Sequence, residues 1–169
     1  MVKRMRKESL QGDMKFISLL EKMGCTVSWE CDGRQNLWLK GPDGKLKGME
    51  VKMSDFSDQA LTLAAIAPFA DSEVTITGIA HIRGQESDRI KVIVDELAKM
   101  GILCNELPDG VKIHPGTPKN TNIETYNDHR VAMSFAVTGL AGDGMTILNP
   151  MCCKKTFAGF FDEIDRLEE

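Results

Sequence analysis

Two short polar segments hold the residue types that could bind and transform an anion. The first reads Arg-Gly-Gln-Glu-Ser-Asp-Arg from Arg83 to Arg89, and the second reads Thr-Tyr-Asn-Asp-His-Arg from Thr125 to Arg130. Each segment opens a helical pattern of apolar residues. Its side chains are therefore expected at a helix N-terminus, where free backbone N–H groups and the helix dipole favour anions. This combination is typical of a site for a phosphate or carboxylate substrate.

Arg89 and Arg130 are the strongest candidates for binding the anion itself. A guanidinium group can bind a carboxylate or a phosphate through two hydrogen bonds and stays charged at any physiological pH. The alternative is that each arginine pairs with a carboxylate of the chain. For Arg89 that partner would be Glu86, three residues earlier on the same helix.

Four further side chains could move protons or balance charge beside a bound anion. They are the carboxylates Asp58 and Glu86, the imidazole of His129 and the amine of Lys155. Each also has a purely structural interpretation. Asp58 could cap a helix, Glu86 could be a first-turn glutamate, His129 could be a structural neighbour of Asp128, and Lys155 could be solvated.

The composition is typical of a globular protein. The chain has 169 residues, 42% hydrophobic and 27% charged, enough for one domain with a substantial core. A net charge of −4 predicts neither a nucleic-acid partner nor a membrane-surface partner. No apolar run follows the basic lead-in at residues 1–8, so we expect a cytoplasmic protein.

The cysteines are odd in number and form no CxxC pair, which argues against a disulfide framework and against a zinc site. We expect no metal. We interpret the cysteines as reduced thiols that mostly pack in the interior: Cys25, Cys31, Cys104, Cys152 and Cys153.

An internal repeat divides the chain. The run Leu-Glu-Lys-Met-Gly that ends at Gly24 recurs as Leu-Ala-Lys-Met-Gly ending at Gly101. Residues 57–60 align with 127–130, and 74–77 align with 145–148. Repeated units of this kind usually share a core. We therefore predict two copies of one unit, at about 13–80 and 81–150.

Each copy has the same order of local signals. Apolar residues at helical spacing predict helices over 13–23, 59–70, 86–100 and 129–141, with a terminal helix over about 155–168. Ser57 and Asn127 are candidate caps, and Gly24 and Gly101 are candidate helix-ending glycines. Strands are predicted near 26–29, 37–39, 49–51, 74–77, 103, 111–114, 123–125 and 145–148, with a tight turn at 108–110.

This order predicts an α/β fold with mixed sheets, built from units of the order α-β-β-β-α-β. Equivalent positions in the two units could then bring Asp58, Glu86 and Arg130 to one end of a shared sheet, the usual place for a site in α/β folds.

The two motifs, together with the segment from Cys152 to Phe157, resemble the 5-enolpyruvylshikimate-3-phosphate synthase family. The resemblance runs from about Ser9 to the C-terminus. It implies repeated βαβαββ-type units within one domain of a two-domain enolpyruvyl transferase fold. Residues 9–169 would form most of the C-terminal domain, and the N-terminal domain would be a missing partner.

The resemblance also implies an activity. An enzyme of this family moves the enolpyruvyl group of phosphoenolpyruvate to the 5-hydroxyl of shikimate 3-phosphate and releases phosphate, on the route to chorismate and the aromatic amino acids. It implies no metal or organic cofactor. Because catalysis by positioning fails when half of the positioning groups are absent, we expect this chain alone to be inactive.

Residue roles follow from the same resemblance. Arg89, Arg130 and Lys155 match positions that contact phosphoenolpyruvate. Glu86 matches a carboxylate associated with proton transfer at C3, and His129 a position that can relay a proton or donate to phosphate.

Asp58 matches the base at the shikimate 3-phosphate hydroxyl. Two further acceptor-side positions depart from the family pattern: His81 stands where asparagine is frequent, and Gln85 where lysine is common. Both departures put the acceptor in question. Two alternatives therefore stay open: an enolpyruvyl transferase for another acceptor such as a UDP-amino sugar, and a non-catalytic anion-binding domain of the same fold.

Overall fold

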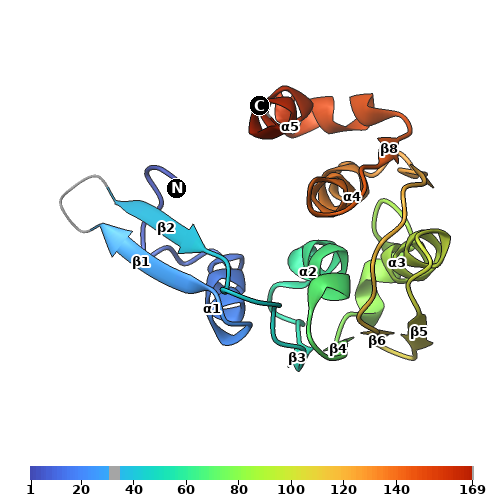
Figure 1. Cartoon of the computed structure of the whole chain (residues 1–169), viewed down its shortest axis with the longest axis horizontal. Coiled ribbons are helices and arrows are strands. Elements are labelled where there is room, and N and C mark those ends of the chain that lie inside the picture. The colour runs from blue at the N-terminus through green and yellow to red at the C-terminus, as the bar shows by residue number, and fades with distance from the viewer. Residues whose placement is uncertain (31–34, 169) are drawn as a thin grey trace.

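The computed structural model describes residues 1–30 and 35–168, and its helices stack above a mixed sheet (Figure 1). The sheet has the strand order β3-β4-β6-β5. Helices α2 and α3 lie over one face of it, α4 lies beyond them, and α5 covers α4. The α/β architecture with mixed sheets that the sequence predicts is confirmed.

The central sheet combines strands from both predicted repeats. Strands β3 (Met49–Lys52) and β4 (Val74–Thr77) pair in parallel, and β4 pairs antiparallel with β6 (Gly110–Ile113). Strand β5 (Cys104–Leu107) forms a hairpin with β6. The two repeats therefore share a sheet.

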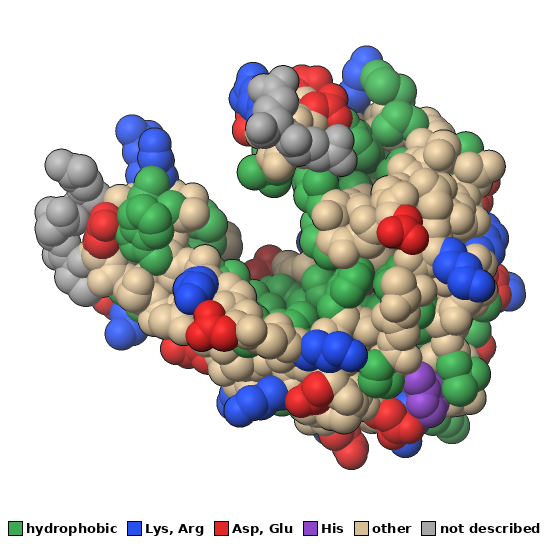
Figure 2. Space-filling model, in the orientation of Figure 1, with side chains coloured by type: hydrophobic (Ala, Val, Ile, Leu, Met, Phe, Trp, Pro, Cys, Tyr) green, Lys and Arg blue, Asp and Glu red, His purple; other side chains and the backbone are tan. Residues whose placement is uncertain are grey.

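Two smaller sheets lie apart from the central one. Strands β1 (Thr26–Glu30) and β2 (Asn36–Lys40) form an antiparallel hairpin at one side of the molecule. Strands β7 (Asn122–Ile123) and β8 (Thr146–Ile147) form a short parallel pair near α4. A hollow with hydrophobic side chains on its floor opens between the hairpin and the C-terminal helices (Figure 2).

The helices follow the predicted apolar patterns. They are α1 (Met14–Lys22), α2 (Ala60–Ile66), α3 (Arg89–Lys99), α4 (His129–Ala141) and α5 (Phe160–Glu168). Short 3₁₀ helices flank them: η1 (Ser57–Gln59), η2 (Ala67–Phe69), η3 (Ala80–Gly84) and η4 (Pro150–Lys155). Gly24 and Gly101 follow α1 and α3 at φ of 101° and 77°, as expected for helix-ending glycines. None of the helices within residues 1–30 and 35–168 is long and apolar enough to cross a membrane.

Several predicted boundaries are wrong. Helix α3 begins at Arg89 and leaves Glu86 outside, because the Asp88 carboxylate accepts a hydrogen bond from Lys91 N (3.1 Å) and caps the helix there. The predicted helix over 155–168 is interrupted, since η4 ends at Lys155 and α5 begins at Phe160.

The predicted caps are also wrong. The N-cap of α4 is Asp128, one residue after Asn127, and its carboxylate accepts a hydrogen bond from Arg130 N (2.9 Å). The hydroxyl of Ser57 lies 2.8 Å from His81 Nε2 and caps neither η1 nor α2.

The core lies between the central sheet and the helices. Along α3, the apolar residues Ile90, Ile93 and Leu97 are fully buried, and so is Met100 directly after the helix, as their spacing predicts. Helix α2 packs against α4, and Thr138 Oγ1 of α4 donates to the carbonyl oxygen of Ala65 at 2.9 Å, so the two helices lie close together. Close packing of these helices brings their N-terminal ends together.

The cysteines of the described segments are free thiols, as predicted. Burial raises the pKa of Cys104 and of Cys153 to about 12, so neither is ionised at neutral pH. This favours packing over a nucleophilic role. The same expectation for Cys31 lies outside the described residues.

Gly110 is a position where a side chain would disrupt the central sheet. A Cβ atom at this residue would lie 1.8 Å from the carbonyl oxygen of Ile76 in the neighbouring strand. We expect Gly110→Ala to lower the free energy of unfolding by about 1–3 kcal/mol or more, because backbone must move to relieve the clash. Urea denaturation measures this. Gly84→Ala is the control, since a Cβ there has open space, and equal losses from both variants would contradict the argument.

Candidate functional site

Charged side chains from the N-terminal ends of α2, α3 and α4 meet in one cluster. Asp58 lies in η1, directly before α2, Arg89 begins α3, and Arg130 is in the first turn of α4. The predicted candidates are therefore brought together, although not at one shared sheet. The strand before Arg130 is β7, which belongs to the separate pair β7–β8. Strands β3 and β7 belong to different sheets, so a shared sheet edge does not bring these side chains together. The packing of α2 against α3 and α4 does.

The buried centre of the cluster is an ion pair between Arg89 and Asp128. Arg89 Nε donates to Asp128 Oδ2 at 2.9 Å, and its Nη2 donates to Oδ1 at 3.3 Å. Arg89 is only 3% exposed and Asp128 is fully buried. Ser87 Oγ also donates to Asp128 Oδ2 at 3.1 Å. The alternative interpretation, in which Arg89 pairs with a carboxylate of the chain, thus holds in the structure, but the partner is Asp128 and not Glu86, which lies outside the helix.

The charge of Asp128 is well stabilised despite its burial. Burial raises the pKa of this carboxyl, but hydrogen bonds from Arg89, from the Arg130 backbone N–H and from Ser87 together hold the pKa below its ordinary value. Asp128 is therefore a carboxylate under any physiological condition. The sequence indicated Asp128 only as the neighbour of His129 and, through the alignment of 57–60 with 127–130, as the repeat equivalent of Asp58.

Asp58 and Arg130 form a second, more accessible pair. Arg130 Nη2 donates to Asp58 Oδ2 at 2.9 Å, and its Nη1 donates to the Asp58 carbonyl oxygen at 3.2 Å. Arg89 Nη1 reaches Asp58 Oδ1 at 3.4 Å. The Asp58 side chain is 45% exposed. Both arginines thus converge on one carboxylate that solvent and a ligand can reach.

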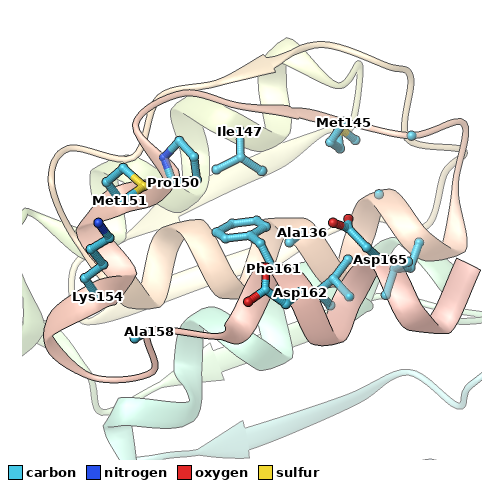
Figure 3. Close-up of a pocket in the computed structure, with 14 residues that line it drawn as sticks. Ala136, Met145, Ile147, Pro150, Met151, Lys154, Ala158, Phe161, Asp162 and Asp165 are labelled. Carbon is cyan, nitrogen blue, oxygen red and sulfur yellow. The ribbon is translucent and has the colours of Figure 1, made fainter.

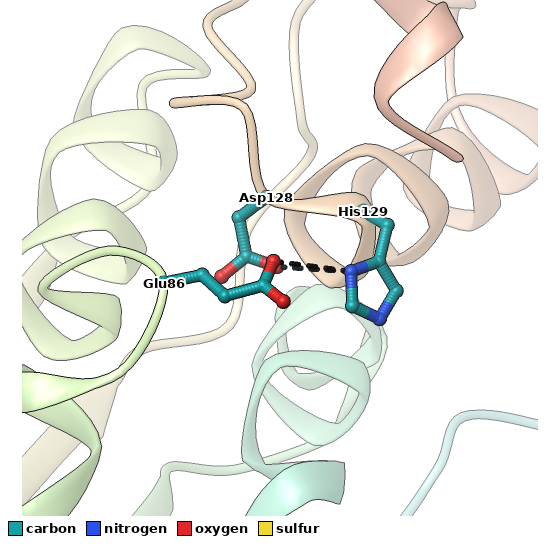
Figure 4. Close-up of side chains that lie close together, drawn as sticks. All are labelled: Glu86, Asp128 and His129. Carbon is teal, nitrogen blue, oxygen red and sulfur yellow. Dashed lines mark hydrogen bonds and ion pairs between the residues drawn. The ribbon is translucent and has the colours of Figure 1, made fainter. Parts of the chain in front are cut away.

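Glu86 connects the remaining cationic groups. Lys155 Nζ donates to Glu86 Oε2 at 2.9 Å, and His129 Nδ1 lies 3.2 Å from the same oxygen. Figure 4 shows the His129 ring facing the carboxylates of Glu86 and Asp128. The hydrogen bond from Lys155 lowers the pKa of Glu86, partial burial and the Asp128 charge oppose it, and the His129 charge assists. Glu86 is therefore suited to accept a proton.

Gln85 and His81, expected on the acceptor side, lie at the edge of the cluster. The side-chain oxygen of Gln85 accepts a hydrogen bond from Arg89 Nη1. His81 contacts Ser57, the residue before Asp58. Both side chains lie on exposed residues. Gln85 thus contacts Arg89 directly, whereas His81 is connected to the cluster through Ser57 of η1.

Glu86, Asp128 and His129 have the residue types of a metal site, and their ligand atoms lie within 4.8 Å of one another. The arrangement nevertheless fits a cation poorly. Both oxygens of Asp128 already accept hydrogen bonds from Arg89, and Lys155 binds the Glu86 oxygen that faces His129. A metal ion would have to displace or oppose these positive charges. An anion, by contrast, would meet the partly exposed cations Arg130 and Lys155, next to the buried Arg89.

The turn before α4 is strained. Tyr126 and Asn127 have φ of 53° and 56°, the left-handed region that bulky residues rarely adopt. The Thr125 carbonyl oxygen accepts a hydrogen bond from Asp128 N at 2.8 Å and closes the turn. Such conformations cost about 1–3 kcal/mol each and persist only where their surroundings impose them. This strain directly precedes Asp128, His129 and Arg130.

A separate cavity of about 640 Å³ lies between α4, β8, η4 and α5 (Figure 3). Its lining is mostly apolar and includes Met145, Ile147, Pro150 and Phe161. Lys154 lines it, but the charged cluster around Arg89 does not. This cavity is therefore distinct from the candidate site.

The family model that matches this chain is that of EPSP synthase (3-phosphoshikimate 1-carboxyvinyltransferase), over residues 1–164. The 3-phosphoshikimate 1-carboxyvinyltransferase of Nostoc punctiforme is 45% identical over 168 residues, which cover 99% of this chain and 38% of that protein. A second such protein, from Halalkalibacterium halodurans, is 45% identical over 93% of this chain and 35% of its own length. The chain thus spans well under half of these relatives.

Solved structures of enolpyruvyl transferases also resemble this chain. An EPSP synthase from Acinetobacter baumannii superposes with a TM-score of 0.78 at 30% identity, over 89% of this chain and 38% of that one. The enolpyruvyl transferase NikO from Streptomyces tendae superposes with a TM-score of 0.71 at 20% identity, over 90% of this chain and 34% of that one. The second likeness concerns the fold alone.

Proposed function

The chain belongs to the EPSP synthase family, and on this premise we propose that its charged cluster is part of an active site for enolpyruvyl transfer. The donor is phosphoenolpyruvate, the acceptor is the 5-hydroxyl of shikimate 3-phosphate, and phosphate is released. Since the chain covers 38% of its Nostoc punctiforme relative, we propose that turnover needs the remaining part of such a protein. Residues 9–169, with repeats at about 13–80 and 81–150, would be the C-terminal domain portion, and we propose a cytoplasmic location.

The observation that carries this proposal is the meeting of Arg89, Arg130 and Lys155 around two reachable carboxylates. Arg130 holds Asp58, and Lys155 holds Glu86, each at 2.9 Å. Both carboxylates are partly exposed, so an anionic substrate can reach Arg130 and Lys155 and take the place of Asp58 and Glu86 as their partner. A phosphate and a carboxylate on one small molecule are the anionic groups that such cations bind.

The reaction assigns a role to each group. Asp58 takes the proton of the acceptor hydroxyl as its oxygen adds to C2 of phosphoenolpyruvate, while C3 gains a proton. The C2–O bond to phosphate then breaks as C3 loses a proton, which restores the double bond. Lys155 supplies the proton that C3 gains. Glu86, whose pKa is lowered, accepts the proton that C3 later loses and passes it back to Lys155 along their hydrogen bond.

Charge and position decide the remaining roles. Lys155 and Arg130 balance the charge of the departing phosphate, and Arg89, which Asp128 holds in place, faces the carboxylate of the donor. His129, next to Glu86, relays protons or donates to phosphate. Asp58, with His81 and Gln85 near it, forms the acceptor side. No step needs a metal or an organic cofactor.

Glu86→Gln is expected to tighten the binding of phosphoenolpyruvate by roughly 5-fold while it lowers turnover. The substitution removes a negative charge that competes for Lys155, and one partly exposed ion pair is worth up to about 1 kcal/mol. Isothermal titration calorimetry at low salt measures the affinity. Glu106→Gln is the matched control, because Glu106 pairs with Arg83. Equal gains from both variants would show a general charge effect only.

The proposal is tested by mixing this chain with the part of the Nostoc punctiforme relative that it does not cover. Formation of the enolpyruvyl product and of phosphate is followed by ³¹P NMR. We expect turnover on mixing and none from either part alone. If both parts fold and associate and no shikimate 3-phosphate is consumed, the acceptor assignment is wrong. A UDP-amino sugar is then assayed as the acceptor. Binding of phosphoenolpyruvate without turnover of either acceptor would favour a non-catalytic anion-binding domain.

A further inference from the structure

A fully buried carboxylate outside the charged cluster contacts the strained turn before α4. Glu96 lies in α3 and is 0% exposed. Its Oε2 accepts a hydrogen bond from the backbone N–H of Glu124 at 3.2 Å, and its Oε1 accepts one from the hydroxyl of Tyr126 at 2.9 Å. Lys99 Nζ, at 2.7 Å, balances its charge. The two oxygens of Glu96 therefore hold the chain just before the turn and within it.

Besides the bond that closes the turn, two further hydrogen bonds reach it, and both are exposed: Tyr126 N–H donates to Glu124 Oε1 at 3.3 Å, and Asn149 Nδ2 donates to Asn127 Oδ1 at 3.5 Å. Tyr126 and Asn127 are both left-handed although neither is glycine. The buried hydroxyl of Thr125 has no hydrogen-bond partner among the described residues, which adds to the cost of this conformation. Observed strain of this kind requires outside contacts that impose it. Glu96 supplies two of them.

We propose that Glu96 is a positioning residue, which holds the turn at Tyr126 and Asn127 so that His129 and Arg130 point into the site. This inference rests on the proposed function, because it concerns the same site. Glu96 acts on these side chains only through the backbone and through the Tyr126 hydroxyl.

The geometry gives Glu96 a partner on its own helix. Arg89 stands seven residues earlier on α3, about two turns away, and holds Asp128 at the other end of the turn. Helix α3 thus fixes the start of α4 at both ends of the strained segment. Burial and the negative charge of Glu96 raise the pKa of Tyr126, so its hydroxyl stays protonated and remains a donor.

The test compares variants of the full chain by NMR and by titration with phosphoenolpyruvate. Glu96→Leu removes both contacts. Glu96→Gln keeps an acceptor for Glu124 N–H, and its amide can donate to the Tyr126 oxygen. Asp95→Asn is the matched control, because Asp95 is the adjacent residue on α3 and pairs with Lys91 instead. The ¹³Cα and ¹³Cβ shifts of Tyr126 and Asn127 report their backbone conformation.

In Glu96→Leu, we expect the ¹³Cα and ¹³Cβ shifts of Tyr126 and Asn127 to lose the values typical of a left-handed backbone. The NMR signals of the buried residues in the central sheet should persist. We expect the affinity for phosphoenolpyruvate to fall about 10-fold, since small misplacements of binding groups have effects of this size. Glu96→Gln should restore most of both properties, and Asp95→Asn should change neither.

Left-handed shifts that persist in Glu96→Leu would overturn the inference. If Glu96→Leu does not fold, Tyr126→Phe serves in its place, because it deletes the Tyr126 hydroxyl contact alone. Unchanged shifts at Asn127 in that variant would equally overturn it. If the parent chain does not bind phosphoenolpyruvate, that result counts against the proposed function of the isolated chain. The ¹³C shifts of Tyr126 and Asn127 still decide separately whether Glu96 holds the turn.

Discussion

Asp128→Leu is expected to lower the free energy of unfolding by about 3–5 kcal/mol, because removal of one partner leaves a buried charge without its main counter-charge. That charge is the Arg89 guanidinium, which is 3% exposed and donates two of its hydrogen bonds to Asp128. The variant also removes the cap of α4, which accepts from Arg130 N. Urea denaturation followed by circular dichroism measures the loss.

Two comparisons separate the buried charge from other effects. Asp43→Leu removes an exposed pair with Lys40, which should cost at most about 1 kcal/mol. The double variant Arg89→Met with Asp128→Leu should recover much of the stability, since an apolar pair can replace a buried ion pair. A double variant less stable than Asp128→Leu would contradict this account.

The same carboxylate predicts how stability depends on pH. The pKa of Asp128 is lower in the folded state than in the unfolded chain, where it is about 3.9. Its contribution is therefore complete above that unfolded value and is lost as the pH falls through the folded pKa. We expect the parent chain to lose stability on acidification below about pH 4, and Asp128→Asn to show a shallower loss over the same range.

Asp58→Asn is expected to lower kcat by about 10²–10⁴, the usual contribution of a general base. The reconstituted mixture of this chain with the remainder of a relative is the sample, and product formation under saturating substrates is the measurement. Fold and stability should change little, because the Asp58 side chain is 45% exposed and an asparagine oxygen can still accept from Arg130. The loss should therefore appear in turnover rather than in the affinity for phosphoenolpyruvate.

Asp55→Asn provides the matched control. Asp55 stands three residues earlier and pairs with Lys15 at 2.7 Å on an exposed surface, so the same substitution there should leave kcat unchanged. If Asp58→Asn retained full turnover, Asp58 would be only a structural partner of Arg130. The helix-start interpretation of this residue would then be preferred over its proposed role as a base.

The spacing of apolar residues predicted the helices well where one face of the helix is apolar and buried. The helix predicted over 129–141 is α4, and the apolar positions predicted for α3 are buried at Ile90, Ile93 and Leu97. Prediction failed at the helix starts. Asp88 caps α3 and excludes Glu86 from it, and Asp128 rather than Asn127 caps α4. Several polar residues compete for the cap in each motif, and the turn geometry selects one of them.

Glu96 shows what a period of apolar residues does not reveal. It is a charged residue on a helix, a type that is almost never fully buried unless it is paired, yet it is fully buried beneath the turn at Tyr126. The tyrosine and the glutamate are 30 residues apart. Periodicity reports the face of a single helix and contains no information on which polar group another segment brings to it.

The sequence by itself determined the family, the α/β architecture and the chemical types of the site, because motifs and helix periods are local properties of the chain. Only the tertiary structure decided which charges pair. Arg89 meets Asp128 across 39 residues, Lys155 meets Glu86 across 69, and Arg130 meets Asp58 across 72. Such pairs depend on how α2, α3 and α4 pack together, since side chains distant in sequence become neighbours only when those helices share a core.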